Sequence, residues 1–244
     1  MDYQTIRLSV TDDVATLTLN RPDVMNALNT QMRAEILDAV RFIDREARVL
    51  VLTGAGAAFC SGQDLGDRAT AAQLDLERVL RDEYEPMLKA IFACPIPTIA
   101  AVNGPAAGAG ANLALAADVV IATENAVFLQ AFARIGLIPD AGGTYWLPRQ
   151  MGFAKAMGAA LFAEPITATQ ASDWGMIWEA IPDAEFAERW QARARQLADG
   201  PTVAYGGIKE ALRSSYSNTL DDQLTLEARL QGAAGKTRDL SLIH

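Results

Sequence analysis

The sequence predicts an α/β fold followed by a helical C-terminal region. Two observations support this prediction: short β-rich runs alternate with segments of helical spacing in the first half of the chain, and the later part is mostly helical in pattern. Such alternation is typical of a largely parallel sheet covered by helices. The chain has 244 residues, half of them apolar, which is enough to bury the core of one large domain or of one domain with a small appendage.

The first segments predict a hairpin, a helix and a buried strand. Residues 5–10 and 14–20 are β-rich and flank a Thr-Asp-Asp turn signal. Residues 27–47 place apolar side chains at helical spacing, and Asn29 is a candidate N-cap. The run at 49–54 (VLVLTG) is almost continuously apolar, which indicates a strand buried on both faces.

The following segments continue this alternation. A second amphipathic helix is predicted at 71–94, where the sequence Pro-Ile-Pro ends it, and a strand, a helix and a strand follow at 98–104, 109–117 and 118–123. Three further helices are predicted at about 185–200, 202–216 and 219–234. We therefore expect a core at 1–190 and a helical region at 191–244.

Composition excludes several classes of protein. The net charge of −9 argues against a nucleic-acid-binding protein, whose affinity depends on neutralising phosphates. The start of the chain does not resemble a signal peptide, and the longest apolar run is too short and too polar to span a membrane. The two cysteines form no CxxC pair, so we expect free thiols and a cytoplasmic location.

The only histidine is His244, the last residue of the sequence. A Ser-His-Asp or Cys-His nucleophile needs a histidine base inside the fold. Catalytic zinc sites usually include at least one histidine ligand. Any catalysis by this chain is therefore expected to proceed without imidazole and without a metal.

Two segments, 49–65 and 98–116, join a predicted strand to a loop of small residues. Neither completes the GxGxxG dinucleotide motif, because Phe59 and Leu113 occupy the positions of the third glycine. A helix beginning near Gly108 would leave its first amides unpaired and would favour an oxygen that carries negative charge.

The loop CSGQDL offers a further backbone N–H, at Gln63. Two such groups aimed at one point form an oxyanion hole. The alternative is that the glycines of the two loops only allow strands and helices to pack closely.

Asp140 lies between a proline and a pair of glycines in RIGLIPDAGGTYWLPRQMG (134–152). Taken alone, it is best interpreted as the N-cap of a helix that begins with AGGTYW. The alternative is a carboxylate that faces a pocket and takes part in chemistry. Both roles are compatible, because a residue at a helix start can still face a pocket.

Four segments together resemble the crotonase, or enoyl-CoA hydratase/isomerase, superfamily: LNRPDVMNALN, VLTGAGAAFCSGQDL, IAAVNGPAAGAGANLALAADVVIAT and GLIPDAGGTYWLPRQMG. The resemblance extends from residue 3 to about residue 230. It implies a spiral of ββα units with a helical C-terminal trimerisation region, and assembly as a homotrimer or a dimer of trimers. It also implies an acyl-CoA thioester substrate and no redox cofactor.

The resemblance assigns the two oxyanion-hole amides to Gln63 and Ala109. Arg21 is a candidate phosphate contact, although a solvated surface charge is an equally good interpretation. The wall of the CoA and substrate channel is assigned to Val24, Ala27, Ala58, Ser61 and Asp64.

The chain departs from the hydratase pattern where hydratases of the family carry two glutamates. These positions, expected to contact the substrate, are Asn112 and Phe132 here, and neither side chain can exchange a proton at neutral pH. Asp140 is then the one carboxylate expected near the acyl group. Apolar neighbours at Phe132, Leu137 and Ile138 would raise its pKa.

Within the superfamily the segments look most like the ring 1,2-epoxyphenylacetyl-CoA isomerases of phenylacetate degradation. This resemblance implies an isomerase that converts the ring epoxide to an oxepin or shifts 3-enoyl-CoA to 2-enoyl-CoA. Another acyl-CoA reaction (hydration, dehalogenation or thioester hydrolysis) and a catalytically silent CoA-binding protein remain alternatives. The chain stops at LSLIH, where relatives continue with a basic helix, so we expect CoA affinity or assembly to be altered.

Overall fold

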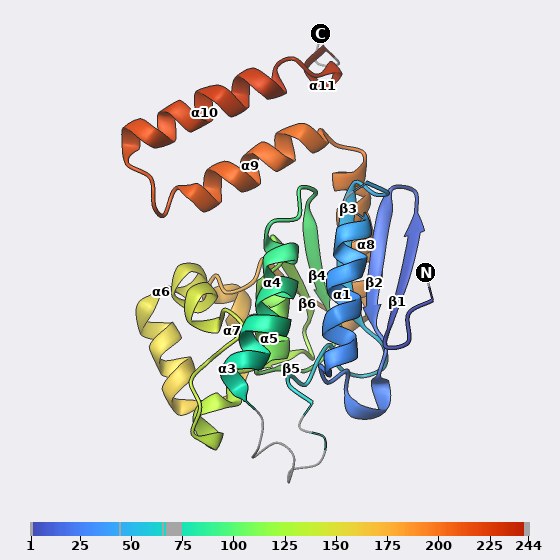
Figure 1. The fold of residues 1–244 in the computed structure, drawn as a ribbon, viewed down its shortest axis with the longest axis vertical. Coiled ribbons are helices and arrows are strands. Elements are labelled where there is room, and N and C mark those ends of the chain that lie inside the picture. The colour runs from blue at the N-terminus through green and yellow to red at the C-terminus, as the bar shows by residue number, and fades with distance from the viewer. Residues whose placement is uncertain (1, 44, 65, 67–74, 242–244) are drawn as a thin grey trace.

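The computed structural model describes residues 2–43, 45–64, 66 and 75–241. Figure 1 shows a central sheet with helices on both faces and a separate pair of helices at one end of the molecule. The predicted α/β core with a helical C-terminal region is confirmed. The single histidine, His244, and the start of the predicted helix at 71–74 lie outside the described residues.

The main sheet has six strands in the order β1-β2-β3-β4-β6-β9. Strands β1 and β2 are antiparallel, and every later neighbour pairs in parallel. Asp12 and Asp13, in the β1–β2 turn, have φ of 49° and 62°, as a type I′ hairpin turn requires. The strands are Ile6–Thr11 (β1), Val14–Leu19 (β2), Val49–Gly54 (β3), Thr98–Val102 (β4), Val119–Thr123 (β6) and Glu179–Ile181 (β9).

Strand β3 separates two apolar cores. Leu50 and Leu52 point into the larger core, which α1 (Thr30–Ile43), α4 (Glu85–Phe92) and α5 (Ala109–Leu115) complete. Val49 and Val51 point into the smaller core beneath α8 (Asp183–Ala198). The prediction that this strand is buried on both faces is confirmed, because both sides of a parallel sheet are covered by helices.

The helix predicted at 71–94 consists of three joined segments. It runs through α3 (Leu76–Val79), a π-helical turn η2 (Leu80–Tyr84) and α4. The helix predicted at 27–47 is α1, which is shorter at both ends, and Asn29 caps it through a 2.8 Å bond from the Met32 amide to Asn29 Oδ1. The Asn29 prediction is therefore confirmed.

Several elements, most of them in the second half of the chain, were not predicted. Strands β5 (Ala106–Ala107), β7 (Val127–Leu129) and β8 (Ile166–Thr167) form a small second sheet. The other unpredicted elements are strand β9 of the main sheet, most of α6 (Gly143–Phe162), which is kinked at Gly152, and four short helices: η1 (Pro22–Val24), η3 (Ala131–Ile135), α7 (Ala168–Asp173) and α11 (Arg238–Ser241).

Helices α9 (Thr202–Ser214) and α10 (Leu220–Ala234) form the pair at the end of the molecule in Figure 1. Neither helix has a buried residue. Asp118 links α9 to the sheet through ion pairs with Lys209 at 2.6 Å and Arg213 at 2.5 Å. The predicted division at residue 190 falls inside α8, which packs on the sheet.

Candidate active site

Two loops at the ends of β3 and β4 run against each other. A β-bridge joins Cys60 to Ala106, and the Ala107 amide donates to the Cys60 carbonyl at 2.9 Å. A Cβ on Gly62 would lie 2.7 Å from the Ala107 carbonyl oxygen, and one on Gly110 would lie 2.3 Å from that of Cys60. These glycines therefore do allow close packing, as the alternative interpretation held, and that packing brings the loop at 60–63 beside the start of α5.

This contact leaves the two predicted oxyanion amides available. Gln63 forms a parallel bridge with Leu28, in which Leu28 donates to Gly62 and Asp64 donates to Leu28. Ala109 is the first residue of α5, where helix amides lack intrahelical partners. Among the described residues, neither the Gln63 nor the Ala109 N–H donates a hydrogen bond in a turn, loop or cap.

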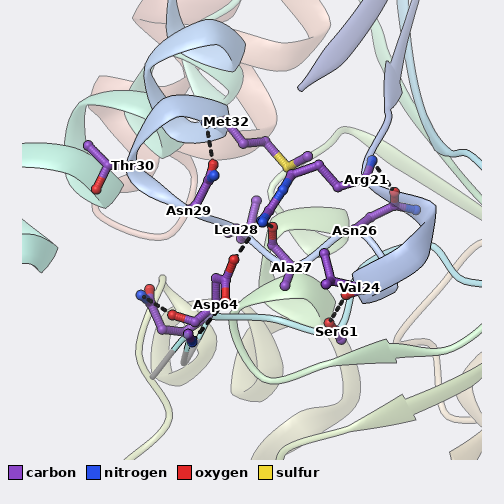
Figure 2. A network of polar contacts seen from close by, with 12 residues as sticks. Arg21, Val24, Asn26, Ala27, Leu28, Asn29, Thr30, Met32, Ser61 and Asp64 are labelled. Carbon is purple, nitrogen blue, oxygen red and sulfur yellow. Dashed lines mark hydrogen bonds and ion pairs between the residues drawn. The ribbon is translucent and has the colours of Figure 1, made fainter. Parts of the chain in front are cut away.

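The loop before α1 is held by buried polar contacts, which Figure 2 shows. Asn26, with φ of 56°, accepts from the Arg21 amide at 2.9 Å and donates to the carbonyls of Ala55 and Ala58, both at 2.9 Å. Its side chain therefore ties this loop to the loop that follows β3.

Arg21 is not a solvated surface charge. Its Nη1 donates to the Ala27 carbonyl at 2.6 Å and pairs with Asp64 at 2.7 Å, and both side chains are about four-fifths buried. Partial burial would raise the pKa of Asp64, but the Arg21 contacts and the Gly66 amide hold it below its usual range. The role of Arg21 as a phosphate contact stays a prediction.

The remaining predicted channel residues lie in the same two loops. Ser61 Oγ donates to the Val24 carbonyl at 3.2 Å, and Val24 is exposed. Ala27 and Ala58 are buried. The residues predicted to contact the substrate are thus brought together from both loops, while their contact with CoA stays a prediction.

Asp140 is not a helix cap. Helix α6 begins at Gly143 after Gly142, which has φ of 83° and offers no side-chain cap, so the N-cap prediction was wrong. The backbone carbonyl of Asp140, rather than its carboxylate, accepts the Gly143 amide at 2.8 Å. The left-handed backbone of Ala141 and Gly142 turns the chain before the helix can start.

The Asn112 side chain holds the loop that contains Asp140. It is fully buried in α5, donates to the Asp140 carbonyl at 2.7 Å and accepts from Gln130 at 2.9 Å. Its polar atoms therefore have protein partners, and it acts on the site through the Asp140 backbone. Phe132 is buried beside Gly108, where an added Cβ would lie 3.6 Å from its ring.

Asp140 lines an open, mostly apolar pocket of about 640 Å³. Its Oδ1 is buried and has no hydrogen-bond partner among the described residues. Desolvation raises the pKa of Asp140 to about 6. The pocket's larger apolar and aromatic lining residues are Leu80, Tyr84, Leu88, Ile138, Pro139 and Trp146, and the charged residues Glu77, Arg81, Glu85 and Lys89 also line it.

The prediction of a raised pKa is confirmed, and desolvation is its main cause, as expected. Ile138 lines the pocket, whereas Leu137 and Phe132 do not. The wall residues that were missed include Leu80, Tyr84 and Leu88, which repeat every four residues along the helix at 76–92. That spacing was visible in the sequence, but nothing there indicated that this face would meet the Asp140 loop.

The described part of the chain contains no group of three or more histidine, cysteine, aspartate or glutamate side chains that could hold a metal ion. Cys60 and Cys94 are buried and form no disulfide. No helix among these residues is long and apolar enough to cross a membrane. The absence of a cofactor stays a prediction.

Comparison with known proteins identifies the family. The profile of the enoyl-CoA hydratase/isomerase family matches residues 9–241. The chain belongs to this family. It is a crotonase-superfamily enzyme, as the four sequence segments predicted, and its fold is the crotonase fold.

Two relatives with different names resemble this member of the family. One from Rhodobacter capsulatus, named "Probable enoyl-CoA hydratase", is 60% identical over 98% of this chain and 93% of its own length. The 1,2-epoxyphenylacetyl-CoA isomerase of Escherichia coli is 47% identical over 93% of this chain and 88% of its own length. The crystal structure of an enoyl-CoA hydratase from Polaromonas superposes with a TM-score of 0.88, at 33% identity over 95% of this chain and 91% of that one.

Proposed function

We propose that this family member is an acyl-CoA isomerase with Asp140 as its acid/base. The observation that supports this most directly is a largely desolvated carboxyl, with a pKa raised to about 6, in an apolar pocket whose wall includes Tyr84, the residue that donates to the Gln63 side chain. A base with a pKa near the working pH combines enough ionised form with enough basicity. Membership of the family supports a CoA thioester as the substrate.

For a 3-enoyl-CoA, one acid/base residue is sufficient, because the proton that is removed is returned to the same molecule. The amides of Gln63 and Ala109 donate to the thioester oxygen, and the Asp140 carboxylate removes a proton from the carbon next to the thioester. The resulting dienolate carries its negative charge on the thioester oxygen. Asp140 then returns the proton at the fourth carbon, so that the double bond moves to the 2-position and no atom is gained or lost.

An aryl epoxide is the second substrate class. The 47% identity to a 1,2-epoxyphenylacetyl-CoA isomerase supports it, as does a pocket with Tyr84 and Trp146 in its wall. Polarisation of the thioester by the same two amides would assist opening of the strained ring. The product, an oxepin, is an isomer of the epoxide, so this reaction needs no second substrate either.

Hydration is the less favoured activity, although a relative of 60% identity carries a hydratase name. Adding water across a double bond needs groups that position and deprotonate the water and groups that protonate the carbon. At the two family positions this chain has Asn112, whose side chain is engaged by Gln130 and the Asp140 carbonyl, and the apolar Phe132.

A substrate panel tests the proposal. Wild-type protein is assayed with a 3-enoyl-CoA, with ring 1,2-epoxyphenylacetyl-CoA and with a 2-enoyl-CoA, beside Asp140→Asn and the exposed control Asp173→Asn. We expect turnover of at least one of the first two substrates and a loss of about 10²- to 10⁴-fold in kcat/KM in Asp140→Asn only. Strong hydration of the 2-enoyl-CoA, or full activity of Asp140→Asn, would contradict the proposal.

A further inference from the structure

We propose that the side chains of Gln63, Tyr84 and Arg33 act as positioning residues that hold the Gln63 amide at the thioester oxygen. This inference rests on the proposed function, because it takes that amide as an oxyanion donor. It assigns a role to a side chain at a position where only the backbone is expected to touch the substrate.

The Gln63 side chain is held from two helices. Its Oε1 accepts from Tyr84 Oη at 2.6 Å and from Arg33 Nη1 at 3.0 Å. Its Nε2 donates to the Asp64 carbonyl at 3.1 Å. A glutamine on a loop that only filled space would not need three contacts of this kind, and together they restrict rotation of the residue that carries the amide.

Arg33 also holds the other side of the bridge that contains this amide. Its Nη1 donates to the Leu28 carbonyl at 2.6 Å, and Leu28 is the β-bridge partner of Gln63. One guanidinium therefore contacts both partners of the bridge. Both bonds are charge-assisted, which makes them stronger than bonds between neutral groups, and together they oppose a shift of Gln63 relative to Leu28.

The Arg33 guanidinium is buried in the interior of the protein. The residue is 2% exposed, pairs with Glu83 at 2.5 Å and lies 4.7 Å from the centre of the Tyr84 ring. A buried cation is destabilising unless it is paired and hydrogen-bonded. Burial also raises the pKa of Tyr84, so its hydroxyl stays a hydrogen-bond donor at neutral pH.

The π-helical turn provides the geometry for these contacts. Glu83 and Tyr84 are consecutive residues of η2 (Leu80–Tyr84), yet Glu83 accepts from Arg33 and Tyr84 donates to Gln63. Such turns insert a residue into an α-helix and occur often at functional sites. Tyr84 also lines the Asp140 pocket, so one side chain joins the wall of the acyl pocket to the amide.

Three variants separate positioning from a general structural role. Gln63→Leu removes both polar atoms at similar size, Tyr84→Phe removes one donor and keeps the ring, and Gln63→Glu keeps an acceptor for Tyr84 and Arg33. The control is Asp82→Asn in the same helical turn, an exposed side chain that does not line the Asp140 pocket. The measurements are kcat, KM and the infrared carbonyl band of bound phenylacetyl-CoA carrying ¹³C at the thioester carbon.

We expect Gln63→Leu to lower kcat roughly tenfold with KM within about twofold, because a small misplacement of a catalytic group affects the transition state more than binding. The carbonyl band should move back toward its frequency in water. Tyr84→Phe should show a smaller change of the same kind, Gln63→Glu should restore most of the kcat, and Asp82→Asn should match wild type.

Unchanged kcat in Gln63→Leu and Tyr84→Phe would overturn the inference. So would a lower kcat with an unmoved carbonyl band, since that result describes a purely structural network. The band is read on a bound thioester that does not react. If wild type polarises it and the variants do not, while no member of the substrate panel is converted, the proposed function fails and the positioning role stands.

Discussion

Asp140 has an unsatisfied side chain on a well-held backbone. Its carboxyl group is mostly desolvated, and Oδ1 has no hydrogen-bond partner among the described residues, whereas its backbone carbonyl accepts hydrogen bonds from Gly143 and Asn112. Buried polar groups are normally satisfied. The exception here is a group held in place by its main chain, so that the carboxyl is available to a substrate.

The raised pKa predicts a pH dependence of the rate. A general base must be ionised, so kcat/KM should fall as the pH drops below about 6, where the Asp140 carboxylate becomes protonated. A pH–rate profile from 5 to 8 with a neutral acyl group on the thioester should show this single limb. A flat profile over that range would contradict the role of Asp140 as the base.

The same shift predicts that Asp140→Asn is more stable than wild type at neutral pH. The carboxyl has a pKa of about 6 in the folded state and about 3.9 when unfolded. Its contribution to stability is therefore complete below about pH 4 and is lost as the pH rises through 6. In urea unfolding at pH 7.5, the free energy of unfolding of Asp140→Asn should exceed that of wild type by on the order of 1–2 kcal/mol, allowing for solvent screening. The difference should shrink toward pH 4.5, and a variant that is less stable at pH 7.5 would oppose this assignment.

At the scale of elements, the glycines of the two loops and of α10 predict a pair of opposite effects. A Cβ on Gly110 would lie 2.3 Å from the Cys60 carbonyl oxygen, so Gly110→Ala must push the loop at 60–63 away from α5. We expect a loss of about 1–3 kcal/mol in stability together with lower kcat.

Gly232, in α10, has no atom within 4 Å of the point that a Cβ would occupy. Gly232→Ala should therefore add roughly 0.5–1 kcal/mol without affecting kcat. Thermal unfolding and the panel assay measure both.

The attachment of α9 to the sheet predicts another change. Asp118 is the carboxylate that pairs with Lys209 and Arg213, and burial lowers the pKa of both cations despite that pairing. Asp118→Asn would leave two positive charges together in a partly buried place. Unfolding experiments should show a loss of about 2–4 kcal/mol, and hydrogen exchange should rise in α9 and α10. The exposed pair of Arg229 and Glu210 is the control, and Arg229→Gln should change stability by less than about 0.5 kcal/mol.

Sequence patterns predicted elements whose cause is local. The β1–β2 hairpin, the Asn29 cap and the apolar strand β3 each follow from residues that adjoin in the chain. Elements that depend on distant partners were missed, as with the three short strands of the second sheet. The Asp140 loop shows the same limit, because its cap pattern was outweighed by left-handed residues and by Asn112, 28 positions away.

At the scale of the whole molecule, helices α9 and α10 carry apolar side chains that remain exposed in the single chain. Neither α9 nor α10 has a buried residue, and Leu212 and Leu220 are 65% and 73% exposed. Large exposed apolar surfaces commonly mark contacts with another protein. The resemblance of the sequence to the crotonase superfamily predicts that these contacts are made between copies, in a homotrimer or a dimer of trimers.

Light scattering on the purified protein tests this assembly directly. Wild type should have the mass of three or six chains, because association removes the apolar faces of α9 and α10 from water. The double variant Leu212→Glu/Leu220→Glu should shift the mass toward one chain, since burying two carboxylates at a contact is unfavourable. Val10→Glu, on the edge strand β1 and 42% exposed, is the control and should keep the wild-type mass. A wild-type mass of one chain at micromolar concentration would show that these helices serve some purpose other than self-assembly.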